Sequence, residues 1–157
     1  MRRSALAVLT ATAMTGAALA QSPFSGLSVD PATALEMSAD RMVVDREGGD
    51  ITMTGSVVVA QGEMRLTGAE VLVFYVERGG EREITRIEAT GDVTLVDAQD
   101  AAEAQRAVYD LDARTVVMTG DVLVTQETGV MAADRMTVDL DSGESVMEGR
   151  VRTVIDQ

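Results

Sequence analysis

The stretch MTGDVLV, residues 118–124, recurs in related form at three other places in the chain: MTGSVVV at 53–59, ATGDVTL at 89–95 and MEGRVRT at 147–153. The glycines of the last three copies are 29 residues apart, and the first precedes the second by 36. Such regular spacing indicates serial structural units, each too small to bury its own apolar face. We therefore base the prediction of the fold on this repeat.

A second sequence element accompanies each glycine phrase. It reads ADRMVVD at 39–45, GAEVLVF at 68–74, AQRAVYD at 104–110 and ADRMTVD at 133–139. Only the second unit is longer, by seven residues, and it contains the turn-like ERGGERE at 77–83. The insertion predicts a hairpin that extends beyond the other strands.

The hydrophobic pattern within each unit has a period of two, which is typical of a β-strand. Around Gly120 the residues of the same parity are apolar: Val116, Met118, Val122 and Val124. A hairpin at Gly120-Asp121 would reverse the chain and interrupt this parity. We therefore expect each repeated glycine to lie within a strand, on its buried face, where glycine permits a sharp bend.

Seven turn-like segments separate these strands: 45–50, 60–63, 77–81, 97–100, 110–115, 126–129 and 139–144. They divide the chain into about eight long kinked strands, or sixteen short ones if every strand bends, and the first covers 34–45. No helical periodicity follows residue 20. The prediction is an all-β fold of bent antiparallel strands in two facing sheets, a jelly-roll-like β-sandwich or flattened barrel, with a β-solenoid as the alternative.

Composition excludes several classes of function. The net charge of −13 leaves no basic surface for nucleic acid. The chain has no histidine or cysteine, so His-dependent catalytic triads, histidine-ligated zinc and disulfides are excluded. The DLD turns at 110–112 and 139–141 do not complete a calcium loop, and turn aspartates explain them better. Nothing places two carboxylates on the inward face, so we expect no enzyme, cofactor or metal site.

The N-terminus has the order of a secretory signal peptide. Arg2 and Arg3 precede an apolar run over 5–19, and the ALA at 18–20 offers a cleavage site. The expected organisation is a signal peptide over 1–20, a flexible N-terminal segment over 21–33 and one β-jelly-roll domain over 34–157. Loss of the two arginines moves the net charge from −13 to −15.

Two groups of residues allow more than one interpretation. Seven methionines lie in strand segments, where they serve either as flexible core or as an adaptable slot for aliphatic chains; they are Met37, Met42, Met53, Met64, Met118, Met136 and Met147. Arginines recur at equivalent places, 41, 106 and 135, where they either bind phosphate or pair with acids on the outer face.

The repeated segments also resemble a known family. ALEMSADRMVVD at 34–45, ITMTGSVVVAQGEMRLTGAEVLV at 51–73, IEATGDVTLVDAQ at 87–99, VVMTGDVLVTQETGVMAADRMTVDLDSGE at 116–144 and VMEGRVRTVI at 146–155 are similar to the LptA/OstA-like family of periplasmic lipopolysaccharide-transport proteins. The resemblance covers about residues 30–155.

This resemblance implies a bent β-jelly roll in the periplasm whose interior takes the acyl chains of lipid A. It also implies head-to-tail self-association into a bridge between an inner-membrane export complex and an outer-membrane translocon. The lipid-binding positions carried over by the resemblance are Leu35, Met37, Met53, Val57, Val59, Leu66, Val73, Tyr109, Val122 and Met136.

The chain departs from a simple electrostatic model of lipid A binding. It contains no lysine and has a large acidic excess, so attraction to lipid A phosphates is a weak source of affinity. Burial of acyl chains, at about 0.8 kcal/mol per CH₂, is the stronger term. The alternative function is a structural scaffold, β-solenoid or adhesin-like, with a dry core.

Overall fold

The computed structural model describes residues 23–25, 27–45 and 48–155. The expected signal peptide over 1–20 lies outside these residues. The described chain forms ten β-strands: β1 (Glu36–Ser38), β2 (Arg41–Val44), β3 (Asp50–Gln61), β4 (Met64–Arg78), β5 (Glu81–Val96), β6 (Ala101–Asp110), β7 (Thr115–Gln126), β8 (Gly129–Asp139), β9 (Ser145–Glu148) and β10 (Arg152–Ile155). None of the described residues belongs to a helix of the length and apolarity that crossing a membrane requires.

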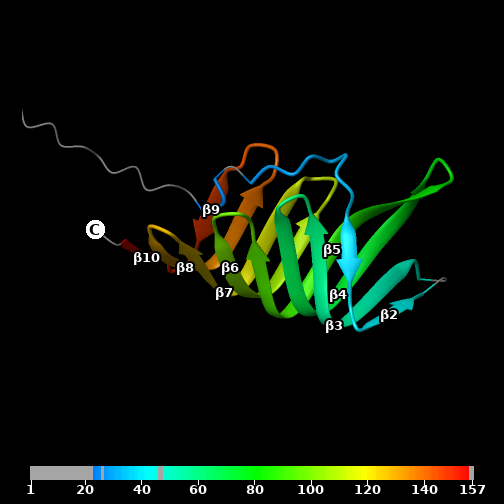
Figure 1. The fold of residues 1–157 in the computed structure, drawn as a ribbon, viewed down its shortest axis with the longest axis horizontal. Helices are drawn as coiled ribbons and strands as arrows, with labels where there is room; N and C mark the ends of the chain where they lie inside the picture. Colours follow the sequence, from blue (N-terminus) through cyan, green and yellow to red (C-terminus); the bar gives the residue numbers. More distant parts are fainter. Residues whose placement is uncertain (1–22, 26, 46–47, 156–157) are drawn as a thin grey trace, which may run out of the picture.

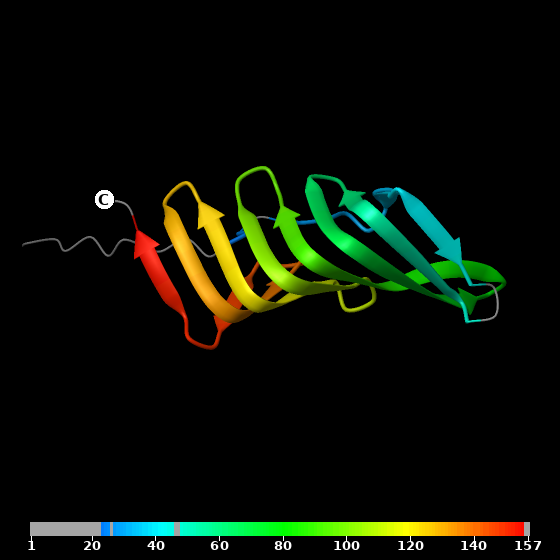
Figure 2. The same cartoon turned by 90° about the horizontal axis from the view of Figure 1, so that it is seen from below.

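All ten strands belong to one antiparallel sheet. From β3 to β8 each strand pairs with the next one in sequence; β1 and β2 both pair with β3, and β9 and β10 both pair with β8. The sheet bends across its middle and is not closed into a barrel (Figures 1 and 2). The predicted all-β, bent antiparallel fold is confirmed, and antiparallel neighbours exclude the solenoid. The expectation of two separate facing sheets is wrong, because one continuous sheet bends instead.

The repeated glycines mark the line along which the sheet bends. In the pairing of β3 with β4, Thr54 lies opposite Glu70 and Val57 opposite Gly68, so Gly55 and Ser56 together oppose one residue. The same two-against-one pattern occurs at Gly91-Asp92 and at Gly120-Asp121. Each is a β-bulge, which bends a strand without reversing it. The prediction that Gly55 and Gly120 lie within continuous strands is therefore confirmed.

The predicted position of these glycines on the buried face is wrong. Gly91 and Gly149 are exposed, and Gly55 and Gly120 are only half-buried. A Cβ added to Gly120 would lie 2.8 Å from the Cβ of Gln105, which belongs to the neighbouring strand β6. The missing side chain is therefore directed along the sheet and not into the interior. Glycine is required because φ is +86° here and the next strand is close.

The first and last predicted strands are each broken at this bend. The expected strand over 34–45 divides into β1 and β2, and the segment 145–155 divides into β9 and β10. The interruptions coincide with the bend line, because the backbone N–H of Asp40 donates to the carbonyl of Gly55, and that of Asp134 to the carbonyl of Gly149, both at 2.9 Å. The bend therefore runs across the whole sheet.

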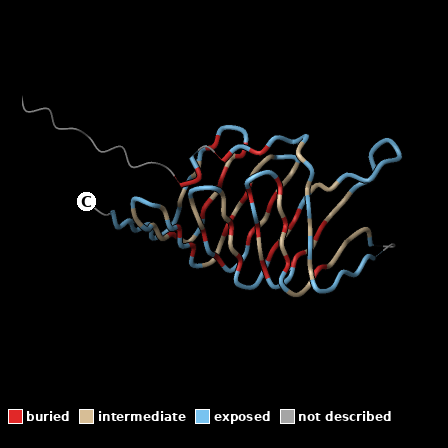
Figure 3. Tube along the Cα trace, viewed as in Figure 1, coloured by how far each residue is buried: buried red, intermediate tan, exposed pale blue. Residues whose placement is uncertain are grey.

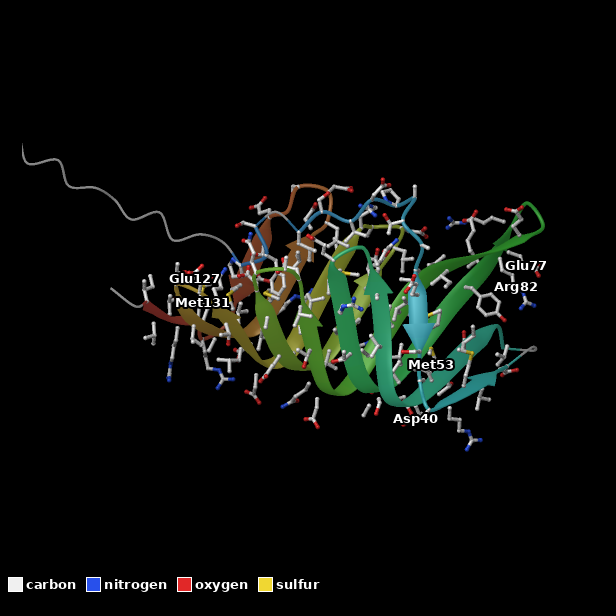
Figure 4. All side chains as sticks on the ribbon, in the orientation of Figure 1. Asp40, Met53, Glu77, Arg82, Glu127 and Met131 are labelled. Carbon is white, nitrogen blue, oxygen red and sulfur yellow. The ribbon has the colours of Figure 1, made fainter. Side chains whose placement is uncertain are left out.

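The concave face of the bent sheet carries the hydrophobic core. Buried and exposed positions alternate along the strands, so one face is apolar (Figure 3). The predicted hairpin extension is formed by β4 and β5, which continue past the other strands and carry Glu77 and Arg82 outward (Figure 4). Its strand β4 is anchored by Arg78, which pairs with Asp112 at 2.9 Å.

A segment without strand structure crosses the sheet before β1 (Figure 1). We name residues 23–25 and 27–33 the N-terminal strap. Phe24, Leu27 and Val29 are at most 5% exposed and belong to the same core cluster as the strands. The sequence predicted only a flexible segment over 21–33. Its described part instead packs its apolar side chains against the domain.

Candidate functional site

The ten positions carried over as lipid-binding gather on one interior face. Eight of them are at most 1% exposed: Met53, Val57, Val59, Leu66, Val73, Tyr109, Val122 and Met136. Leu35 and Met37 are partly buried and pack against the same cluster. The positions come from strands β1, β3, β4, β6, β7 and β8 and the residue preceding β1. The fold therefore assembles residues distant in sequence into one continuous apolar wall.

Hydrophobic periodicity places these side chains inward, and the bulges keep them there. Met53 precedes the bulge of β3 and Val57 follows it, yet both have no solvent exposure. The two positive φ angles at Gly55 and Ser56, +80° and +47°, turn the chain while retaining the inward parity. Each bent strand therefore contributes inward side chains on both sides of the bend.

The interior contains very little polarity. Among the described residues, Gln61 is the single polar or charged side chain in the buried set apart from the Tyr109 hydroxyl. Tyr109 donates from its hydroxyl to Oε1 of Gln61 at 2.8 Å, and burial raises the pKa of Tyr109 above its usual 10.0. The Gln61 side-chain amide in turn donates to the carbonyl of Thr33 in the strap at 2.9 Å. Such an interior suits hydrocarbon and offers no charged partner.

Successive turns lie at alternate ends of the strands and therefore form two rows. We call these rows the rims, and the open side of the bent sheet between them the mouth. The first rim contains the turns at 62–63, 97–100 and 127–128, and the second contains those at 79–80, 111–114 and 140–144. The strap lies along this mouth (Figure 1). Solvent does not reach the eight most buried positions below it. The interior is thus closed in this conformation.

Two of the three recurring arginines form ion pairs on the outer face. Arg106 pairs with Glu88 at 2.6 Å, and Arg135 pairs with Glu148 at 3.8 Å. Both arginines are exposed, and each directly precedes a buried residue of its strand, Ala107 or Met136. Pairs of this kind add little stability, and their charges do not enter the interior.

The turn aspartates serve the turns, as expected. Oδ1 of Asp139 accepts hydrogen bonds from the backbone N–H groups of Asp141 and Ser142 at 2.9 and 2.8 Å. Both bonds lower the pKa of Asp139 below its usual 3.8, and the bond from Ser142 has the larger effect. In the other DLD turn, Asp110 accepts from the N–H of Ala113 at 2.8 Å.

The two ends of the sheet expose apolar side chains at strands with a free edge. Met42, Val43 and Val44 are exposed on β2, and Val154 and Ile155 are exposed on β10. Among the described strands, each of these two pairs with a sheet neighbour on one side only. Free backbone donors and acceptors beside apolar side chains favour pairing with another chain.

The strap and Gln61 are the features of this site that the sequence did not predict. The sequence of the strap does contain a pattern that suggests burial, because the apolar Phe24, Leu27 and Val29 are separated by the polar Ser25 and Ser28. The segment is too short to show a reliable period. No sequence pattern predicts the burial of Gln61, since a glutamine at the end of a strand is usually exposed.

Comparisons with known proteins agree with this geometry. A family model described as "LptA/(LptD N-terminal domain) LPS transport protein" matches residues 36–144, more than half of the chain. Among solved structures, LptH, the LptA-homologous periplasmic component of the conserved lipopolysaccharide transport device from Pseudomonas aeruginosa, is similar with a TM-score of 0.71 and 19% sequence identity. The match covers 82% of this chain and 99% of LptH.

At this identity the likeness to LptH supports the fold alone, and no curated protein matches the chain. The family model carries the assignment, because it spans β1 to the β8–β9 turn and therefore includes the three bulges at Gly55, Gly91 and Gly120. The chain belongs to the family of LptA and LptD N-terminal-domain lipopolysaccharide transport proteins, and it is a transport protein, not an enzyme.

Proposed function

We propose that this protein is a periplasmic bridge component that carries lipopolysaccharide with the acyl chains of lipid A in its apolar interior. The bridge would connect an inner-membrane export complex with an outer-membrane translocon. The observation that carries the proposal is the continuous apolar wall from β3 to β8, to which eight of the ten expected positions contribute fully buried side chains.

Burial of hydrocarbon supplies the affinity in this proposal. Each CH₂ group removed from water contributes about 0.8 kcal/mol, so a twelve-carbon chain gains at most about 9 kcal/mol before ordering costs. The interior is suited to this role because its wall consists mainly of Met, Val, Leu and Ala side chains, and flexible thioethers such as Met53 and Met136 adapt to chains of varied shape.

The open ends of the sheet support head-to-tail association of copies of the chain. The edge at β1 and β2 differs from the edge at β9 and β10, so a contact between them is heterologous and propagates instead of closing. Each such contact would continue the interior of one molecule into the next. Transfer of a lipid along a chain of molecules requires this continuity.

Photo-crosslinking tests the acyl-chain path directly. A crosslinker at Met53, Val122 or Met136 should capture lipopolysaccharide, because these side chains point inward. The matched controls Thr52, Asp121 and Thr137 are adjacent in sequence and point to the other face, so they should capture none. Equal capture at both sets, or capture at neither, would exclude the interior as the path.

The closed interior favours one alternative, a scaffold with a dry core. The eight wall positions are already packed and shielded from water. Mass spectrometry of the purified protein separates the two functions, since a carrier should retain lipid A and a dry scaffold should yield none.

A further inference from the structure

An acyl chain can reach the interior wall only if some element moves. The strands β3 to β8 are each held by a neighbouring strand on both sides. The strap is held differently. Within the described residues its backbone-to-backbone hydrogen bonds are internal, from Leu27 to Phe24 and from Thr33 to Asp30, both at 2.9 Å. The strap can therefore leave without breaking a strand ladder.

Side chains from both rims hold backbone groups of the strap over the mouth. On the first rim, the carboxylate of Asp100 accepts from the backbone N–H of Phe24, and Gln126 donates to the same carboxylate at 3.0 Å. On the second rim, Arg114 donates to the carbonyl of Val29, and Ser145 donates to the carbonyl of Pro23. The strap thus bridges the two ends of the bent strands.

Backbone groups make the polar contacts of the strap with the strands and turns, and its apolar side chains point into the core. Phe24, Leu27 and Val29 join the same buried cluster as the wall positions Met53 and Val122. Gln61 marks the junction, because one end of its amide accepts from Tyr109 and the other donates to Thr33. The strap therefore covers with its own side chains the apolar surface that an acyl chain would cover.

We propose that the N-terminal strap is a built-in competitor of the lipid: Phe24, Leu27 and Val29 occupy the acyl-chain path of the empty protein, and an incoming acyl chain displaces them. This inference rests on the proposed function and names the regulation of the same site. The strap would shield the apolar wall from water in the empty state. It would also help to expel the lipid during transfer.

Competition of this kind weakens binding by a predictable amount. The apparent affinity equals the intrinsic affinity multiplied by the fraction of molecules whose strap is displaced. Since the strap is covalently attached, its local concentration is high and independent of the protein concentration. A substitution that removes apolar contact from the strap should therefore tighten lipid binding, whereas loss of an ordinary core side chain should not.

The first experiment compares two leucine substitutions in the full chain. Leu27→Ser loosens the strap, and Leu95→Ser removes an equally apolar side chain from β5, which remains in the sheet. With purified hexa-acylated lipid A as the probe, Leu27→Ser should lower the apparent Kd by about tenfold relative to the unchanged protein. Leu95→Ser should leave it unchanged or raise it.

The second experiment measures displacement itself. The chain contains no cysteine, so Leu27→Cys introduces a single thiol. A maleimide should label this thiol slowly in the empty protein, where the side chain at position 27 is 5% exposed, and about tenfold faster at saturating lipid A. Leu95→Cys is the control, and its thiol should stay protected in both states.

The outcomes separate the two proposals. If lipid A binds but Leu27→Ser does not tighten binding, or the thiol of Leu27→Cys stays protected at saturation, the strap is ordinary core and the competitor model is wrong, while the transport function stands. If lipid A binds neither the unchanged protein nor Leu27→Ser, the transport function is wrong and the competitor model falls with it.

Discussion

Tyr109 and Gln61, 48 positions apart in sequence, are joined by a buried hydrogen bond of 2.8 Å. Tyr109 is the penultimate residue of β6, and Gln61 is the last residue of β3. The same glutamine holds Thr33 of the strap. In the described structure, the buried side chain of Gln61 therefore connects Tyr109 of the apolar wall to the strap through two hydrogen bonds.

Tyr109→Phe should lower the free energy of unfolding by about 1–2 kcal/mol, because Oε1 of Gln61 would remain buried without its donor. Tyr75→Phe is the matched control. The Tyr75 hydroxyl is buried and has no hydrogen-bond partner in the described structure, so its removal should cost nothing or stabilise the fold. Urea denaturation measures both, and an equal loss in the two variants would contradict the assigned role of the bond.

Stability should fall at alkaline pH in a way that depends on Tyr109. Burial raises the pKa of this phenol in the folded state above 10.0, so the unfolded chain loses its proton first. The contribution is complete below about pH 10 and is lost as the pH rises through the folded pKa. Unfolding free energies measured from about pH 8 to about pH 11 should therefore decline more steeply in the unchanged protein than in Tyr109→Phe; parallel curves would refute this.

Gly120→Ala should destabilise the protein by about 2–3 kcal/mol, because φ is +86° and the new Cβ would lie 2.8 Å from the Cβ of Gln105. Gly79→Ala separates the two causes. Gly79 also has a positive φ, +60°, but an added Cβ there meets nothing within 4 Å, so only about 1 kcal/mol is expected. Thermal unfolding measures the difference, and equal losses would show that the neighbouring strand does not constrain the bulge.

Val154→Glu should weaken self-association, since it places a charge on the free edge at β10, where Val154 is 67% exposed. Leu123→Glu is the control, because Leu123 is also exposed but lies on β7, which pairs with β6 on one side and β8 on the other. Light scattering over a concentration series should show a ladder of oligomers for the unchanged protein and for Leu123→Glu, and fewer large species for Val154→Glu. A strict monomer or one sharp dimer for the unchanged protein would refute head-to-tail growth.

The strands, their inward faces and the places where they bend follow from local sequence patterns. Alternation around Gly120 predicts an inward Met118 and Val122, and both are buried. The turns and the hairpin extension are equally local, because they depend on residues within a few positions of one another. The repeat strengthens these predictions, because the same local pattern occurs in each unit. The family resemblance rests on the same local phrases.

The contacts of the bends and of the strap depend on the tertiary structure. The missing side chain of Gly120 points toward Gln105 because β6 lies beside β7 at that level, a fact that no local pattern contains. Likewise, the strap is buried because turns far along the chain, at Asp100 and Arg114, supply its partners. Periodicity specifies which face of a strand is apolar. Which segment covers that face depends on contacts between residues many positions apart, and these form only when the sheet has bent.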